Sequence, residues 1–316
     1  MADHRHDHDH DHDHGHDHGH GHGHRHGPVS HDRAFAVGTV LNAGFVAAEV
    51  VFGLQAHSVA LLADAAHNLG DVLGLLMAWA AAVLTRLPPS RRRTYGWGRS
   101  SILASLLNAS VLLVGIGAIG VEALHRLLAP EPVTQRTVLL VAGVGILING
   151  GTALMFMRGR ERDLNIRATY LHMVTDAVVS LGVMVSALLI GLSGWLWIDP
   201  LTSLAIVAVI AVGTWGLLRE SVALALDAVP GGIRHEDVYD YLAGLPGVIE
   251  VHDLHIWGLS TTESALTVHL VSAENACRPH EIAAELRSRF GIGHVTVQVE
   301  HGAEAEWCRL RPDNVV

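Results

Sequence analysis

The chain has 316 residues, half of them hydrophobic, and a formal net charge of −10. Its apolar residues lie in long blocks without the alternation of a soluble domain, which excludes an ordinary water-soluble fold and indicates a membrane protein. Much of the acidic charge comes from aspartates in the first 20 residues, and the arginines form no basic patch of the kind that binds nucleic acid. We therefore expect membrane lipid around the chain and no nucleic acid as a partner.

Residues 1–31 form a low-complexity tract with 13 histidines, most of which alternate with Asp or Gly. A segment of this composition cannot bury a core, so we expect a disordered cytoplasmic tail that attracts metal ions. The alternative is a purification tag, but such tags are usually homopolymeric.

Six hydrophobic segments follow, and each is close to the roughly 20 residues that span a bilayer core. They predict an all-α transmembrane bundle of six helices within residues 32–220. The segments are residues 34–53, 59–84, 102–124, 137–157, 168–190 and 197–218.

The arginines between the segments indicate how the bundle is oriented. They are concentrated in the second-to-third and fourth-to-fifth connections, whereas the first-to-second and fifth-to-sixth connections have none. Positive charge favours the cytoplasmic side, so we expect both termini inside and Trp195 and Trp197 at the outer interface. The arginines concerned are Arg86, Arg91, Arg92, Arg93 and Arg99, then Arg158, Arg160, Arg162 and Arg167.

Beyond residue 220 the composition becomes that of a soluble domain. An αββαβ order predicts an α+β domain of ferredoxin-like type over residues 221–302, with a C-terminal tail at 303–316. The two cysteines, Cys277 and Cys308, exclude a disulfide framework and fit a reducing compartment. The predicted elements are helix 234–243, strands 248–257 and 264–272, an amphipathic helix with Ile282, Leu286 and Phe290, and strand 294–300.

Ionisable residues at membrane depth are costly and therefore indicate function. His67 precedes Asp71 by four residues, and His172 precedes Asp176 by four, so each pair lies on one face of its helix. Two such faces turned together offer two imidazoles and two carboxylates, a set that suits Zn²⁺. Nitrogen ligands disfavour Mg²⁺ and Ca²⁺, and Cd²⁺, Co²⁺ and Ni²⁺ remain open. Alternatively, the pairs only hydrogen-bond between helices.

Three further acids lie within or beside the apolar segments. Asp64 could line the ion path, orient a ligand histidine, or bond to an Asn or Ser of a neighbouring helix. Glu49 is predicted at the outer mouth. Asp199 begins the sixth segment and is predicted to cap that helix.

The run Ser58–Asp71, the loop Tyr95–Arg99 and the run Asp163–Asp176 resemble the cation diffusion facilitators, in particular their bacterial zinc-efflux branch. The resemblance covers residue 33 to about 300. It implies a homodimer in the inner membrane, with six transmembrane helices per protomer and a cytoplasmic ferredoxin-like domain, that exchanges Zn²⁺ for H⁺ by alternating access. It maps the transport site onto His67, Asp71, His172 and Asp176.

The resemblance also implies metal binding in the cytoplasmic domain. His252 and His269 occupy positions similar to family ligands, and His280 is a third candidate. Gln298 stands where some relatives have a histidine, so the implied set of ligands is incomplete. The weaker candidates are His255, His294, His301 and Cys308.

Two other functional classes are less consistent with these residues. A metalloenzyme needs an open position on its zinc, whereas four protein ligands fill the coordination shell, and the chain has no His-Glu-x-x-His motif. We therefore expect no enzyme. A membrane-anchored metal sensor or storage protein would need only the tail and the soluble domain. The intramembrane pairs thus favour transport.

Overall fold

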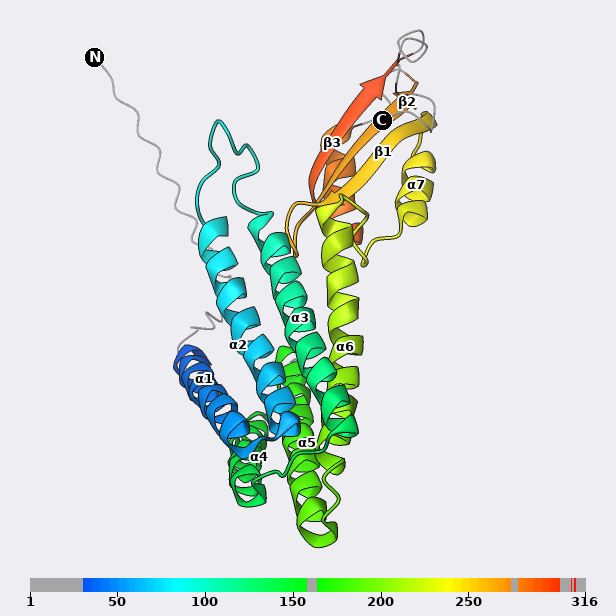
Figure 1. Cartoon of the computed structure of the whole chain (residues 1–316). Coiled ribbons are helices and arrows are strands. Elements are labelled where there is room, and N and C mark those ends of the chain that lie inside the picture. The colour runs from blue at the N-terminus through cyan, green and yellow to red at the C-terminus, as the bar shows by residue number, and fades with distance from the viewer. Residues whose placement is uncertain (1–30, 158–163, 274–277, 302–307, 309, 311–316) are drawn as a thin grey trace, which may run out of the picture.

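The computed structural model describes residues 31–157, 164–273, 278–301, 308 and 310 (Figure 1). Several predicted features lie outside these residues: positions 1–30 of the histidine-rich tail, Arg158, Arg160, Arg162, Cys277 and most of the C-terminal tail. Six long helices come first: α1 (His31–Ala56), α2 (Val59–Thr85), α3 (Ser100–Leu128), α4 (Gln135–Phe156), α5 (Leu164–Ser193) and α6 (Ile198–Ala225). The elements that follow are α7 (His235–Ala243), β1 (Val248–Gly258), β2 (Ser264–Ser272), α8 (Pro279–Phe290) and β3 (Ile292–Glu300).

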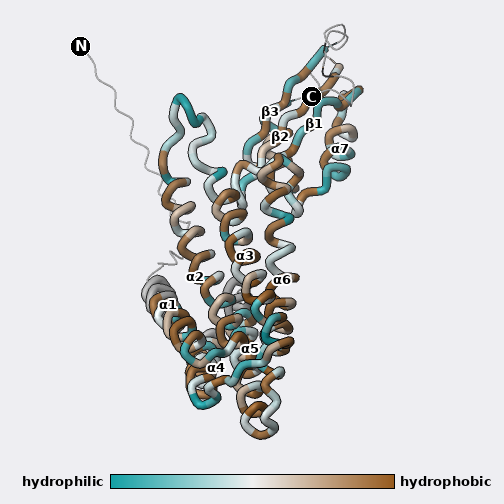
Figure 2. Tube along the Cα trace, viewed as in Figure 1, coloured by the Kyte–Doolittle hydropathy of each residue, from teal (hydrophilic) through white to brown (hydrophobic). Residues whose placement is uncertain are grey.

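The six long helices form a bundle whose outer surface is apolar. Five of them, α2 to α6, are long and apolar enough to cross a membrane, and the apolar part of α1 is the shorter stretch Val40–Ala56. Figure 2 shows hydrophobic residues along all six helices and hydrophilic ones in the connection between α2 and α3. Large side chains such as Leu147 and Val212 are exposed on this surface, as expected where a helix contacts lipid. The arrangement agrees with the predicted helical membrane domain.

Buried apolar side chains close the bundle at the end away from the β-sheet. One cluster joins residues from all six helices, and most of them come from the helix ends on that side. Trp195 and Trp197 stack at the same end, in the connection between α5 and α6 (Figure 1). The cluster comprises Ala56, Ala60, Leu61, Ala63, Ile116, Val138, Ala142, Val183, Ala187, Ile206 and Ile210.

The side chain of Asp199 caps a different helix from the one predicted. Asp199 lies in the first turn of α6, but Trp197 is the N-cap residue and no side chain caps that end. The carboxylate instead accepts hydrogen bonds from Val59 N and Ala60 N, at 2.8 and 3.3 Å, and from Ser58 Oγ. The prediction was wrong because these otherwise unpaired donors at the start of α2 lie within reach of the carboxylate.

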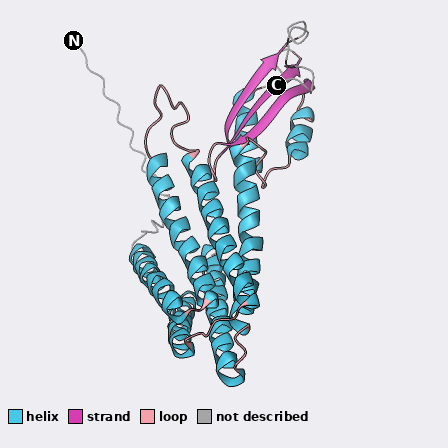
Figure 3. Ribbon diagram, in the orientation of Figure 1, coloured by secondary structure: helices cyan, strands magenta, loops and turns pink. Residues whose placement is uncertain are grey.

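The C-terminal part folds as the predicted αββαβ unit, with three strands in one sheet (Figure 3). The strand order is β1-β2-β3; β1 pairs with β2 in antiparallel fashion and β2 with β3 in parallel. Val268 and Leu270 of β2 pack in one core with Leu242 of α7 and Leu286 of α8. Because side chains alternate along a strand, His269 points to the opposite face of the sheet, away from that core.

The C-terminal domain rests on the start of α3. α6 continues to Ala225, beyond the predicted boundary at residue 220, and an ion pair joins Arg99 to Asp227 just after that helix. The loop between β1 and β2 contacts α3, because Thr261 N donates a hydrogen bond of 3.1 Å to Ser101 Oγ. Gly98 packs so closely on this loop that a Cβ atom there would lie 2.8 Å from the Leu259 carbonyl oxygen.

Candidate metal centres

The two predicted His-Asp pairs meet across the interface between α2 and α5. His67 Nε2 of α2 lies 3.1 Å from Asp176 Oδ1 of α5. Reciprocally, His172 Nε2 of α5 lies 3.3 Å from Asp71 Oδ2 of α2 and 3.7 Å from Asp176 Oδ2. Each histidine therefore faces a carboxylate of the other helix, and the four side chains form one group, which we call the membrane cluster.

Three members of the membrane cluster lie close enough together to share a single cation, and His172 lies beside them. Ligand atoms of His67, Asp71 and Asp176 all lie within 4.8 Å of one another, and the His67 and His172 ring centroids are 6.1 Å apart. Asp71 Oδ2 and Asp176 Oδ2 are buried and have no hydrogen-bond partner among the described residues. Two imidazoles and two carboxylates with free lone pairs can together hold a tetrahedral dication.

Exposure to solvent differs strongly within the membrane cluster. The side chains of His172 and Asp71 are 40% and 25% exposed, whereas that of Asp176 is 1% exposed. Ser180, one turn further along α5 towards the closed end, is fully buried. The cluster thus has an exposed side, formed by Asp71 and His172, and a buried side next to the apolar packing.

Glu49 and Asp64 lie on the buried side of the membrane cluster. Glu49 was predicted at the outer mouth, but it is fully buried and accepts a hydrogen bond of 2.9 Å from Asn68 Nδ2. That prediction was wrong because the side chain turns towards α2 and not towards water. Asp64 is also fully buried and accepts a hydrogen bond of 2.8 Å from Ser180 Oγ, the third of the roles considered for it.

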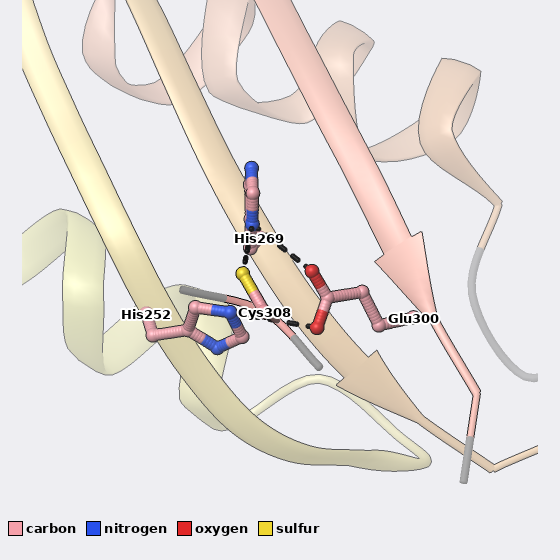
Figure 4. Close-up of side chains that lie close together, drawn as sticks. All are labelled: His252, His269, Glu300 and Cys308. Carbon is pink, nitrogen blue, oxygen red and sulfur yellow. Dashed lines mark hydrogen bonds and ion pairs between the residues drawn. The ribbon is translucent and has the colours of Figure 1, made fainter. Parts of the chain in front are cut away.

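A second group of possible ligands lies on the helix-free face of the sheet (Figure 4). His252 of β1 stands directly opposite His269 of β2. His269 Nδ1 lies 3.0 Å from Glu300 Oε1 of β3 and 3.4 Å from Cys308 Sγ, and His252 Nε2 lies 3.5 Å from Glu300 Oε2. We call these four residues the sheet cluster; their ligand atoms all lie within 4.8 Å of one another.

The sheet cluster contains polar atoms that form no hydrogen bond with the described residues. Both ring nitrogens of His252 and Glu300 Oε2 are buried without a hydrogen bond to any described residue. Gln298 Nε2 donates to Glu300 Oε1 at 3.0 Å, and Asp253 Oδ2 lies 3.6 Å from the second ring nitrogen of His269. Nitrogen, sulfur and carboxylate ligands with orienting neighbours are a set that suits Zn²⁺ or a similar ion.

The other predicted ligands of the C-terminal domain lie apart from the sheet cluster. His280 was predicted as a third ligand, but its side chain is 79% exposed at the start of α8, beside Glu281. It lies outside the sheet cluster. Glu300 was not predicted, and Cys308, a weaker candidate, belongs to the group. The remaining histidines have other neighbours: His255 lies beside Asp253, His294 beside Tyr95, and His301 beside the Ser272 carbonyl.

Comparison with known proteins identifies the family. Residues 35–224 match the protein-family domain described as "Cation efflux transmembrane domain". Residues 230–302 match the domain described as "Cation efflux protein, cytoplasmic domain". The chain belongs to the cation efflux family. As a member, it is an integral membrane transporter and not an enzyme, and its C-terminal domain is cytoplasmic. This confirms the family resemblance seen in the sequence.

Several curated proteins resemble this cation efflux protein over most of their length. The metal cation efflux system protein CzcD of Cupriavidus metallidurans is 36% identical over 86% of this chain and 88% of that protein. Zinc transporter ZitB of Escherichia coli is 33% identical, over 83% and 85%. A cadmium, cobalt and zinc/H⁺-K⁺ antiporter of Bacillus subtilis is 31% identical, over 86% and 89%.

Proposed function

We propose that this cation efflux protein carries Zn²⁺ out of the cytoplasm in exchange for protons, by alternating access. The membrane cluster carries the proposal, because it brings the His67 and His172 imidazoles together with the Asp71 and Asp176 carboxylates between two membrane helices. The names of its relatives, which include a zinc transporter and a cadmium, cobalt and zinc/H⁺-K⁺ antiporter, support zinc as a cargo and protons as a counter-ion.

The same ligands couple the movement of zinc to the movement of protons. Zinc binds neutral imidazole and ionised carboxylate, so protonation of either residue type expels the ion. Closed packing on one side of the site and exposed ligands on the other support a state in which zinc loads from the cytoplasm. Rearrangement of the helices would then expose the site to the outside, where protons displace the ion.

We further propose a homodimer in a bacterial inner membrane, with both termini in the cytoplasm and residues 1–31 serving to concentrate metal. The domain boundaries that we propose separate this tail, a membrane domain over 32–220, a ferredoxin-like domain over 221–302 and a short C-terminal tail. The sheet cluster would hold a second metal ion through His252, His269, Glu300 and Cys308, because the His252 nitrogens and Glu300 Oε2 have no hydrogen-bond donor or acceptor among the described residues and fit a cation.

Purified protein in proteoliposomes with a preset pH gradient tests the exchange. Zn²⁺ uptake should follow the gradient in size and direction, and uptake that ignores the gradient would refute proton exchange. Competition of Cd²⁺, Co²⁺, Ni²⁺ and Mn²⁺ against Zn²⁺ in the same vesicles tests selectivity. Deletion of residues 1–31 should raise the zinc concentration needed for half-maximal uptake and leave uptake at saturating zinc intact.

A further inference from the structure

Glu49 and Asp64 form a buried pair of acids next to the membrane cluster, and neither belongs to the proposed set of zinc ligands. Both side chains are fully buried, Glu49 on α1 and Asp64 on α2. The two carboxyls lie within hydrogen-bonding reach of each other. Each has one conventional donor, Asn68 for Glu49 and Ser180 for Asp64.

The second oxygen of each carboxyl lacks a hydrogen-bond donor. Glu49 Oε1 and Asp64 Oδ1 are buried and have no partner among the described residues. An ionised carboxylate can only accept hydrogen bonds, so two ionised carboxylates in contact would leave both oxygens unsatisfied and would repel each other. One proton between them turns one oxygen into a donor and satisfies the other, which is how paired carboxyls in proteins commonly share a proton.

The charges around the pair favour the same conclusion. Asp176 of α5 faces both carboxyls and adds a further negative charge, whereas His67 of α2 faces Asp64 and offsets part of that charge when its imidazole is protonated. α4 also packs on α1, but its only charged residue is Arg136, in its first turn. Within the part of the chain that the structure describes, neither acid forms an ion pair with an arginine or histidine. Two buried carboxylates in contact, with no ion-pair partner bonded to either, are costly at membrane depth, so one proton between them is favoured.

We propose that Glu49 and Asp64 share one proton while the membrane cluster is empty, and that zinc binding beside Asp176 releases this proton. The dication compensates the negative charge that had held the proton, so the O–H bond of the shared carboxyl breaks, the proton passes to water and two carboxylates remain. Reprotonation of the pair from water reverses the step and weakens zinc binding by the same amount, as linkage requires. This inference rests on the proposed exchange of zinc for protons and adds a proton site outside the zinc ligands.

Calorimetric titration of ZnCl₂ into the full chain in nanodiscs, in two buffers of different ionisation enthalpy, counts the protons released per zinc. Glu49→Gln keeps the hydrogen bond to Asn68 but cannot ionise, and it should release about one proton fewer than the unchanged chain. Asp64→Asn should show the same deficit, and the double variant no further deficit, because the proton is shared. The sheet cluster is identical in all variants, so its own contribution cancels in the comparison.

Asn149→Ala, which removes a buried but non-ionisable side chain of α4, is the matched control and should leave the proton count unchanged. Equal proton release in Glu49→Gln and the unchanged chain would overturn the proposal. Deficits that add in the double variant would show two separate protons and overturn the sharing. If Glu49→Gln does not fold, as judged by gel filtration, Asp64→Asn carries the same prediction. Zinc flux that ignores a pH gradient in the unchanged chain would refute the exchange itself, independently of these counts.

Discussion

Ser58 Oγ donates a hydrogen bond of 2.5 Å to Asp199 Oδ1, although 141 residues separate them in the sequence. Together with the bonds from Val59 N and Ala60 N, it joins the first turn of α2 to the first turn of α6. α2 also carries His67 and Asp71, so this link holds the helix that presents half of the membrane cluster.

Substitution of Asp199 should therefore loosen α2. Asp199→Ala leaves buried donors without an acceptor and should lower the free energy of unfolding by about 1 to 3 kcal/mol. Asp199→Asn keeps one acceptor oxygen and should cost less. Unfolding of the protein in nanodiscs, followed by circular dichroism, measures both. An unchanged stability in Asp199→Ala would contradict the anchoring role.

Loss of a buried ligand should abolish transport without unfolding the chain. Asp176→Ala removes the most deeply buried carboxylate of the membrane cluster and should weaken zinc binding there by roughly 100-fold or more. Thr175→Ala is the matched control, because Thr175 lies next to it, is exposed and donates its hydroxyl hydrogen bond to the Leu171 carbonyl of its own helix. Zinc uptake into vesicles should disappear in the first variant and persist in the second. Full uptake in Asp176→Ala would remove this residue from the site.

The sheet cluster predicts a thiolate-bound metal in the cytoplasmic domain. Co²⁺ bound through Cys308 should give a sulfur-to-metal charge-transfer band in the near ultraviolet, and Cys308→Ser should remove that band. Glu300→Gln should keep the band and weaken binding by roughly 10- to 100-fold. His280→Ala, which changes an exposed histidine outside the cluster, should alter neither. A band that survives Cys308→Ser would exclude the cysteine as a ligand.

The contact between Gly98 and Leu259 predicts that the two domains act together. An added methyl group at Gly98 would meet the Leu259 carbonyl, which is backbone and cannot turn aside. Gly98→Ala should therefore separate the loop from α3 and lower the zinc uptake rate severalfold, while zinc binding to both clusters stays intact. Gly115→Ala, within α3 at a position with open space around it, should leave uptake unchanged. If both variants transport at the same rate, this junction does not matter for transport.

Local spacing was enough to predict which side chains face each other across α2 and α5. In both helices the histidine precedes the aspartate by four residues, which puts each pair on one face whatever the rest of the bundle does. Helix-like and strand-like patterns likewise predicted the αββαβ order of the C-terminal domain. These inferences succeeded because they depend on periodicity within single elements.

The remaining contacts depend on neighbours far along the chain and could not be predicted. Asp199 begins α6 as expected, but its partners belong to α2. The position of Glu49 gave no indication that Asn68 would turn its carboxylate inward. Gln298 and Glu300 share one face of β3. Gln298 is the residue opposite His269, yet Glu300, two residues further along, is the one that contacts both histidines. The bulge in β1 between His252 and His255 also shifts the register there.

The uneven exposure of the membrane cluster has a consequence for how an ion sheds its hydration shell. A hydrated dication that comes from the accessible side meets Asp71 and His172 first, while it can still keep water on its opposite face. Only the last coordination steps, towards His67 and Asp176, require the ion to leave bulk solvent. Dehydration is thus divided into successive ligand exchanges, so no single step must remove the whole water shell.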